Sequence, residues 1–172
     1  MATLGEILVE WLEAYGVDSV FGIPGVHTVE MYRGLAASTI RHVTPRHEQG
    51  AGFMADGYAR ISDEPGVAFV ITGPGLTNIA TAMAQAYADS VPMLVVSSVN
   101  ARGALGMEVG DLHEVRRQGL IAAQCAAFSH TVLTPGEVPA VLARAWAVFE
   151  GARPRPVHIE IPRDLFAAEA GE

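Results

Sequence analysis

Hydrophobic residues along the chain follow two spacings, one typical of helices and one typical of buried strands. At the N-terminus, apolar residues recur every three to four positions from Leu4 to Tyr15, and Thr3 with Glu6 has the pattern of a capping box. Val20 to Ile23 is a continuous apolar run that ends at Pro24-Gly25, which predicts a buried strand followed by a turn. The same succession then repeats.

This repetition predicts six strands separated by helices. Strands are expected over the runs 20–23, 40–44, 66–72, 93–98, 129–133 and 157–161, and helices over 3–15, 28–36, 49–60, 76–89, 114–124 and from Thr134 onward. Strands that are apolar on both faces and alternate with helices are typical of a parallel sheet covered on each side. We therefore predict an α/β fold with a doubly wound, six-stranded and mostly parallel sheet that has helices on both faces.

The length of 172 residues predicts one domain. We place this domain at 1–166 and the beginning of a linker to further domains at 167–172, because the sequence after Pro162 has the composition of a connection. Ligands of such sheets bind beyond the carboxyl ends of the strands. The loops of interest are therefore 24–27, 45–49, 73–78 and 100–113.

Composition and charge exclude several classes of protein. Half of the residues are hydrophobic and 17% are charged, which excludes intrinsic disorder. The net charge is −8 and the basic residues do not cluster beyond Arg116-Arg117, so no nucleic acid partner is expected. No apolar run approaches the roughly 20 residues that cross a bilayer, and acidic residues interrupt any signal peptide, so we expect a cytoplasmic protein without a membrane partner. Low charge with 18 glycines indicates that another chain or domain covers some of the surface, and small-residue helices with low charge favour a homo-oligomer.

Most common catalytic motifs do not occur in the sequence. There is no Walker phosphate loop, no Gly-x-Ser-x-Gly elbow and no His-Glu-x-x-His helix. Cys125 is the single cysteine, and the six histidines lack ligand spacing, so we expect no metal ligands in this chain. The turn from Thr72 to Asn78 half fits a dinucleotide-binding glycine turn, but Asn78 replaces the third glycine. A generic tight turn and a turn that approaches a ligand both stay open, and NAD binding fits less well.

A glutamate between a strand and a helix is the main candidate for chemistry. Glu48 can simply complement the partial positive charge at a helix N-terminus. The helix behind it, however, carries a flank of small residues that would let another backbone come very close, as across an interface: Gly50, Ala51, Gly52, Ala55 and Ala59. A glutamate at such an interface would be desolvated and its pKa is expected to rise, which makes it a candidate acid or hydrogen-bond donor.

Several segments occur in the order and spacing of one enzyme family. They are Phe21-Gly22-Ile23-Pro24-Gly25, Arg46-His47-Glu48-Gln49-Gly50-Ala51, Ala55-Asp56-Gly57-Tyr58-Ala59-Arg60, Thr72-Gly73-Pro74-Gly75-Leu76-Thr77-Asn78, Asp89-Ser90-Val91-Pro92 and Arg155-Pro156-Val157-His158-Ile159. Together they resemble the N-terminal pyrimidine-binding domain of thiamin-diphosphate (thiamine pyrophosphate) enzymes of the acetolactate synthase and 2-oxo-acid decarboxylase superfamily. Within it, 21–33 and 112–114 look most similar to 2-ketoarginine decarboxylases.

The resemblance implies roles for individual residues. Glu48 would be the catalytic residue that hydrogen-bonds N1′ of the aminopyrimidine and favours the imino tautomer, whose 4′-nitrogen removes the C2 proton of the thiazolium. The resulting ylide attacks the carbonyl of a small 2-oxo acid. Residues implied at the cofactor are Pro24, Gly25, Glu48, Gly73, Pro74, Gly75 and Asn78. Asn78 could instead cap a helix, and the substrate-side candidates His27 and His113 could instead be structural.

The resemblance also implies that this chain supplies half of a site. The family binds the diphosphate and Mg²⁺ through a Gly-Asp-Gly segment in a C-terminal domain, and this sequence has no such segment. The expected partner is a diphosphate-binding domain, either of the same enzyme or of a partner subunit, in a homodimeric lyase or transferase that acts as a decarboxylase or carboligase. The alternative from another class is a non-catalytic nucleotide-binding or assembly module.

Overall fold

Six strands form one sheet in a computed structural model that describes residues 2–151 and 153–169. The strands are β1 Ser19–Gly22, β2 Arg41–Val43, β3 Gly66–Val70, β4 Met93–Val99, β5 Phe128–Thr131 and β6 Val157–Pro162. Their order is β2-β1-β3-β4-β6-β5, and every neighbouring pair is parallel. The predicted doubly wound α/β fold is confirmed, and the sheet is parallel throughout the described residues.

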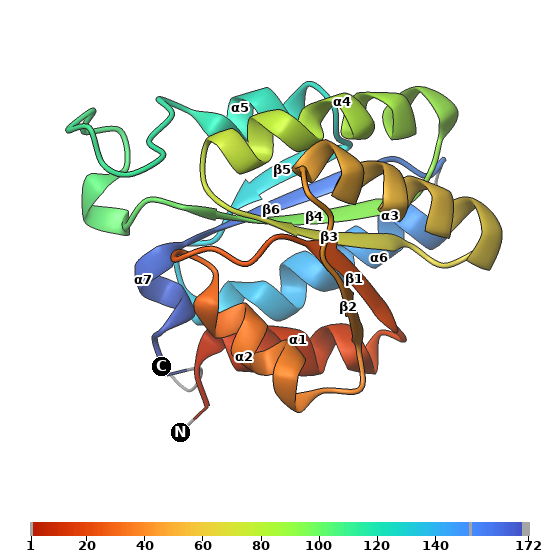
Figure 1. The fold of residues 1–172 in the computed structure, drawn as a ribbon, viewed down its shortest axis with the longest axis horizontal. Helices are drawn as coiled ribbons and strands as arrows, with labels where there is room; N and C mark the ends of the chain where they lie inside the picture. Colours follow the sequence, from red (N-terminus) through yellow and green to blue (C-terminus); the bar gives the residue numbers. More distant parts are fainter. Residues whose placement is uncertain (1, 152, 170–172) are drawn as a thin grey trace.

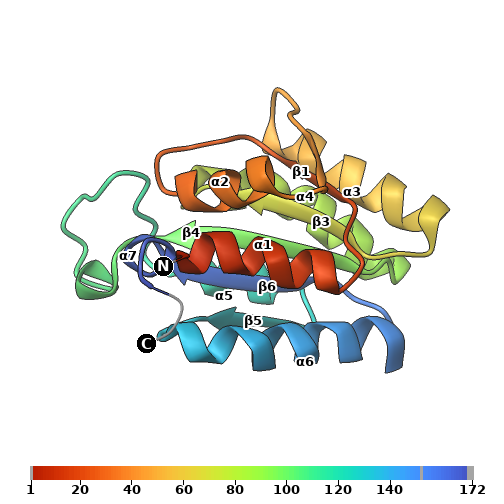
Figure 2. The ribbon, with the colours of Figure 1, turned by 90° about the horizontal axis from the view of Figure 1, so that it is seen from below.

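Helices cover both faces of this sheet. They are α1 Leu4–Ala14, α2 Val29–Ala37, α3 Glu48–Ser62, α4 Pro74–Asp89, α5 Gln118–Ala123, α6 Val138–Gly151 and α7 Arg163–Phe166, with 3-10 turns η1 Arg102–Ala104 and η2 Pro135–Glu137. Helices α3, α4 and α5 lie on one face, and α1, α2 and α6 lie on the other (Figure 1; Figure 2 shows the second set from below). The predicted capping box of α1 is present, because the Thr3 side chain accepts from the Glu6 backbone N–H.

The two faces differ in the size of their side chains. The α1–α2–α6 face packs large apolar residues into one core cluster, among them Leu4, Leu8, Leu12, Met31, Phe69, Leu142, Trp146, Phe149 and Phe166. The cluster on the α3–α4–α5 face contains many alanines, namely Ala51, Ala55, Ala59, Ala68, Ala86, Ala122 and Ala126. Side chains alternate along each strand, so neighbouring residues such as Val67 and Ala68 point to different faces.

The small residues of α3 bring elements of this same chain together. An added Cβ at Gly52 would lie 2.5 Å from the Ala82 Cβ of α4 and 2.7 Å from the Ile79 Cγ1. A Cβ at Gly66 of β3 would overlap the backbone carbonyl of Ala55. Gly52 and Ala55 of the small-residue flank therefore make close approaches inside this domain, to α4 and β3 respectively, and the interface with another chain stays a prediction.

Several boundaries differ by a few residues from those predicted, and two segments differ most. The helix expected over 114–124 begins only at Gln118, because residues 111–117 form turns in which Glu114 accepts from the backbone N–H groups of Gly110 and Asp111. The segment after Pro162 continues as α7, whose Leu165 and Phe166 are buried. The expected linker 167–172 is described only to residue 169, and residues 170–172 lie outside the described part.

The strand order reverses at two places, and these are the places where a ligand site is expected. The chain runs from β1 to the edge strand β2 and then returns to β3 on the other side of β1; later β5 occupies the opposite edge and β6 enters between β5 and β4. Ligands of open parallel sheets bind beyond the strand carboxyl ends at such reversals. None of the described helices is both long and apolar enough to span a membrane.

Candidate active site

Glu48 lies at the carboxyl edge of the sheet and is held by a second helix. It is the first residue of α3, and the preceding His47 caps this helix by accepting from the Gln49 N–H at 3.1 Å. Asn78 of α4 donates its Nδ2 to Glu48 Oε2 at 2.9 Å. Asn78 therefore does not cap a helix; the cap residue of α4 is Gly73. The two candidates that sequence analysis names 30 residues apart are in direct contact.

The second oxygen of Glu48 and a nearby tyrosine are unpaired. Within the described residues, no hydrogen bond reaches Glu48 Oε1, and the buried hydroxyl of Tyr32 has no hydrogen-bond partner. Burial raises the pKa of Tyr32, and the negative charge of Glu48 raises it further. A Cβ added to Gly22 would lie 2.7 Å from the same hydroxyl, which places it at the end of β1. The site thus combines an available carboxylate oxygen with a neutral buried hydroxyl.

The two predicted turns, 24–27 and 73–78, both pack against Ile71 at the reversal between β1 and β3. An added Cβ at Gly25 would lie 2.6 Å from Ile71 Cδ1, and one at Gly75 would lie 2.9 Å from Ile71 Cγ2. Gly73 has a φ of +61°, and a Cβ there would overlap the carbonyl of His113. These turns require glycine for steric reasons. Pro24 and Pro74 complete the turns, and Pro74 begins α4.

His27 and His113 lie close to each other and next to the Gly73 turn. Their ring centroids are 6.1 Å apart with the rings nearly perpendicular. His27 is buried, and burial together with the charges of Arg163 and His113 lowers its pKa. Arg163 Nη1 lies 3.3 Å from His27 Nε2, which must accept because arginine only donates. The neutral ring then donates from Nδ1 to Thr72 Oγ1 at 2.9 Å.

A cavity of about 390 Å³ adjoins this histidine. His27, Leu112 and Arg163 line it, together with Val26, Glu30 and Asp164. Asp111 accepts from Arg163 Nη2 at 3.3 Å, which ties the loop after β4 to the end of β6. The two histidines predicted from sequence therefore lie beside each other although their positions are 86 apart in the chain, and of the two His27 lines this cavity.

Gln118, Tyr32 and Arg163 were missed by sequence reasoning. Gln118 is buried at the start of α5; its Oε1 accepts from Gly73 N at 2.8 Å, and its Nε2 donates to Ser98 O at 2.8 Å. It therefore holds the Gly73 turn to β4. No motif marks any of the three residues. The partners of Gln118 and Arg163 are distant in sequence, and the Tyr32 hydroxyl has none within the described residues, so no local signal could have found them.

The described residues contain no group of three or more His, Cys, Asp or Glu side chains that could hold a metal ion.

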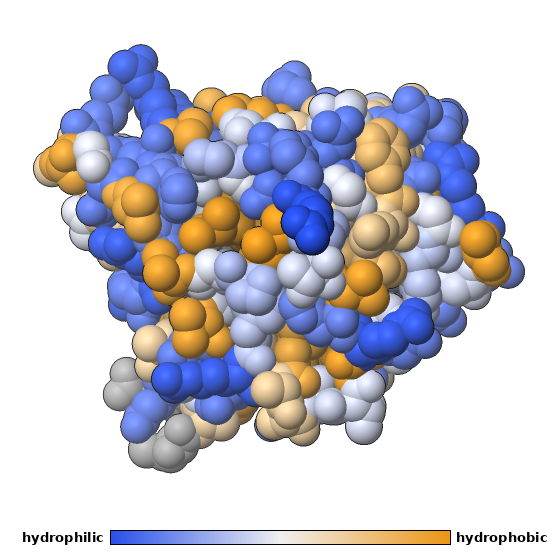
Figure 3. Space-filling view, viewed as in Figure 1, coloured by the Kyte–Doolittle hydropathy of each residue, from blue (hydrophilic) through white to orange (hydrophobic). Residues whose placement is uncertain are grey.

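The surface seen in Figure 3 carries separate hydrophobic areas among hydrophilic side chains. Exposed apolar residues on α3 include Phe53, Met54 and Ile61, of which Ile61 is 87% exposed. The expected homo-oligomer stays a prediction.

Comparisons with known proteins identify the family of this chain. Residues 2–127 match the family model described as thiamine pyrophosphate enzyme, N-terminal TPP binding domain. The chain is 63% identical over 166 residues to the probable 2-ketoarginine decarboxylase AruI of Pseudomonas aeruginosa, which covers 96% of this chain and 30% of that protein. It is 38% identical over 167 residues to the mitochondrial acetolactate synthase catalytic subunit of Saccharomyces cerevisiae (96% of this chain, 24% of that protein). It spans less than a third of the length of these relatives.

Proposed function

Because the chain belongs to the thiamine pyrophosphate enzymes, as their N-terminal TPP-binding domain, we propose that it binds the pyrimidine end of thiamin diphosphate in a 2-oxo-acid decarboxylase or carboligase. The observation that carries the proposal is the carboxyl group of Glu48, with one oxygen held by Asn78 and the other without a partner among the described residues. The same family match favours an enzyme over the alternative of a non-catalytic nucleotide-binding module.

The residues at the β1–β3 reversal fit an aminopyrimidine ring. A flat heteroaromatic ring needs a polar partner for its ring nitrogen and backbone that can approach its faces. Glu48 offers the polar partner. Gly25, Gly73 and Gly75 carry no side chain in the two turns, and the space where a Cβ would stand is filled by Ile71 and His113 of this same chain. We therefore assign the pyrimidine-binding role to these residues with Pro24, Pro74 and Asn78.

Glu48 is the proposed catalytic residue. Its carboxyl group would share a proton with the N1′ nitrogen, and the Asn78 amide would orient it by donating to Oε2. The hydroxyl of Tyr32, which lacks another partner among the described residues, is expected to donate to the same carboxylate. Thiamin diphosphate, when bound, supplies the thiazolium that accepts the electrons released on decarboxylation.

The substrate proposed for the whole protein is a 2-oxo acid. The relative named 2-ketoarginine decarboxylase is 63% identical to this chain over the 166 aligned residues, which favours decarboxylation of a 2-oxo acid with a guanidino side chain over carboligation. His27 and His113 are the proposed substrate-side groups. The lowered pKa of His27 keeps its ring neutral near pH 7, so that it acts through hydrogen bonding rather than as a fixed cation.

The proposed site is completed by a second domain. A diphosphate-binding domain, from the same enzyme or from a partner subunit, would hold the diphosphate and Mg²⁺. A homodimer in the cytoplasm is the arrangement we propose. The relatives are more than three times as long as this chain, which leaves room for such a domain in each of them.

Exchange of the C2 proton tests the role of Glu48. In the complete enzyme, Glu48→Gln should slow hydrogen–deuterium exchange at C2 of bound thiamin diphosphate by about 10²- to 10⁴-fold, the range of general acid–base contributions. Quenched-flow NMR measures this exchange, and calorimetry confirms that the cofactor is still bound. Glu64→Gln, an exposed substitution just beyond the other end of α3, is the matched control and should leave exchange unchanged. Exchange at the wild-type rate in Glu48→Gln would refute the proposal.

A further inference from the structure

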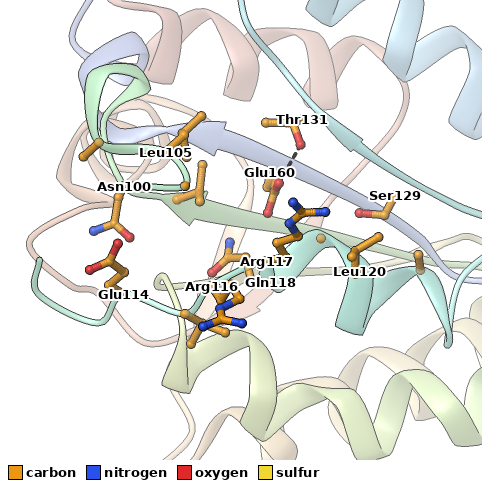
Figure 4. A pocket seen from close by; sticks show the side chains of 16 residues that line it. Asn100, Leu105, Glu114, Arg116, Arg117, Gln118, Leu120, Ser129, Thr131 and Glu160 are labelled. Carbon is orange, nitrogen blue, oxygen red and sulfur yellow. Dashed lines mark hydrogen bonds between the residues drawn. The ribbon is translucent and has the colours of Figure 1, made fainter. Parts of the chain in front are cut away.

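A second cavity lies beside the other reversal of strand order, at which β6 enters between β4 and β5. It has a volume of about 440 Å³, which is within the range of small-molecule sites. Residues of β5, β6, α5 and the loop after β4 line it, and Figure 4 shows their side chains from close by. Glu48 and Asn78 are not among the lining residues, so this cavity is separate from the proposed cofactor site.

A buried carboxyl group without a full set of partners lines this cavity. Glu160 of β6 is only 6% exposed. Its Oε1 accepts from Thr131 Oγ1 at 2.6 Å, whereas its buried Oε2 has no partner within the described residues. Burial raises the pKa of this carboxyl, and hydrogen bonding from the Thr131 and Gln118 side chains opposes the shift only in part. An unsatisfied buried acceptor is unfavourable, and a ligand that donates to it would remove this cost.

A positive group without a partner lines the same cavity. The guanidinium of Arg117, at the start of α5, makes no ion pair or hydrogen bond within the described residues, whereas the neighbouring Arg116 pairs with Glu108 at 2.9 Å. Figure 4 shows the side chains of Arg117 and Glu160 both reaching into the cavity. No ion pair joins these two, so each is available to a group of opposite charge on a ligand.

The remaining walls are apolar and held in place. Leu105, Val115 and Leu120 supply apolar side chains. Gln118, another wall residue, is fixed by its hydrogen bonds to Gly73 and Ser98. The cavity therefore offers a carboxyl group, a guanidinium cation and an apolar wall in one preformed space.

We propose that this cavity binds a free aliphatic α-amino acid, whose ammonium group pairs with Glu160, whose carboxylate pairs with Arg117, and whose side chain contacts Leu105 and Leu120. A simple cation would leave Arg117 unpaired, and a simple anion would leave Glu160 unpaired. An α-amino acid carries both charges close together and an apolar side chain beside them. This binding site is independent of the cofactor function proposed above.

Calorimetric titration of the full-length protein, without thiamin diphosphate, tests the ligand class. The probes are L-leucine, 3-methylbutylamine, which lacks the carboxylate, and 4-methylpentanoate, which lacks the ammonium group. L-leucine should bind, and each analogue should bind at least about ten-fold more weakly, because each leaves one charged residue unpaired. Absence of L-leucine binding, as expected if another part of the protein fills the cavity, would overturn the proposal, and so would equal binding of either analogue.

Matched variants test the location. Glu160→Gln and Arg117→Gln should each weaken L-leucine binding at least about ten-fold. Glu150→Gln and Arg144→Gln make the same chemical changes at exposed positions of α6, on the opposite face, and should bind like the wild type. Arg117 is exposed, so its variant remains informative even where Glu160→Gln fails to fold in a thermal denaturation control. Unchanged binding in Arg117→Gln would overturn the assignment. Glu48→Gln should also bind L-leucine like the wild type, which separates this test from that of the cofactor site.

Discussion

The two faces of the sheet are built from different side chains, although they share the same six strands. The α1–α2–α6 face is packed with large apolar residues such as Leu8, Phe69 and Phe149. The α3–α4–α5 face combines alanines with buried polar residues, among them Gln118, His158 and Glu160. Both proposed sites use helices of this second face.

This difference indicates which face contributes most of the stability and which face positions the functional groups. Large apolar side chains contribute most of the hydrophobic free energy, because that energy scales with buried apolar area. Small residues contribute less area but let α3 and α4 approach closely enough for Asn78 to reach Glu48. We infer that the α1–α2–α6 face mainly stabilises the fold, and that the α3–α4–α5 face mainly positions polar groups.

The largest effect is expected from truncation on the apolar face. Leu8 is fully buried, so Leu8→Ala should lower the free energy of unfolding by about 2–5 kcal/mol. Urea denaturation measures this change. Leu133→Ala, which truncates a leucine that is 51% exposed, should change it by no more than about 0.5 kcal/mol. Equal effects at both positions would contradict the proposed division.

A smaller effect is expected from adding one methyl group to the α3–α4–α5 face. Gly52→Ala should destabilise the fold by about 1–3 kcal/mol, because the new Cβ would meet Ala82 and Ile79 of α4. Gly57→Ala in the same helix has open space and should stabilise it by about 0.5–1 kcal/mol, the usual gain for alanine over glycine. A stabilising Gly52→Ala would show that α3 and α4 are not tightly packed.

The polar interior of the same face should make stability depend on pH. His158 bonds Ser97 Oγ at 2.8 Å and Ser129 Oγ at 2.7 Å, and burial lowers its pKa from 6.5 to about 3. Between these values the unfolded chain binds a proton that the folded chain does not, so stability is lost as the pH falls from 6.5 toward 3.

The slope from this one group is at most about 1.4 kcal/mol per pH unit. Urea denaturation at several pH values should show that His158→Gln has a shallower dependence than the wild type over this window. The same slope in both proteins would mean that another group is responsible.

The smallest effect on stability is expected at the site itself. Glu48 is half-buried and makes one hydrogen bond to Asn78, which the amide oxygen of a glutamine can also accept. Glu48→Gln should therefore change the free energy of unfolding by no more than about 0.5 kcal/mol, while it slows C2 proton exchange in the complete enzyme by about 10²- to 10⁴-fold. A large loss of stability, measured by thermal denaturation, would show that Glu48 belongs to the stabilising part of the fold.

Much of the fold could be predicted because its signals are local. The spacing of apolar residues located all six strands, and the glycines at 25, 73 and 75 marked turns that do require glycine. The position of Glu48 at a strand–helix junction was also readable. The short α7 was missed because its four residues are too few for a helical period, and it forms where Leu165 and Phe166 become buried.

The amino-acid sequence by itself determined the succession of elements, the parallel α/β class and the candidates at the ends of the strands, because periodicity and turn chemistry depend on neighbouring residues. Only the tertiary structure decided which candidates meet. Asn78 with Glu48, Gln118 with Gly73, and Thr131 with Glu160 are contacts across 29 to 45 residues of chain. Such contacts follow from strand order and helix packing, which no short stretch of sequence encodes.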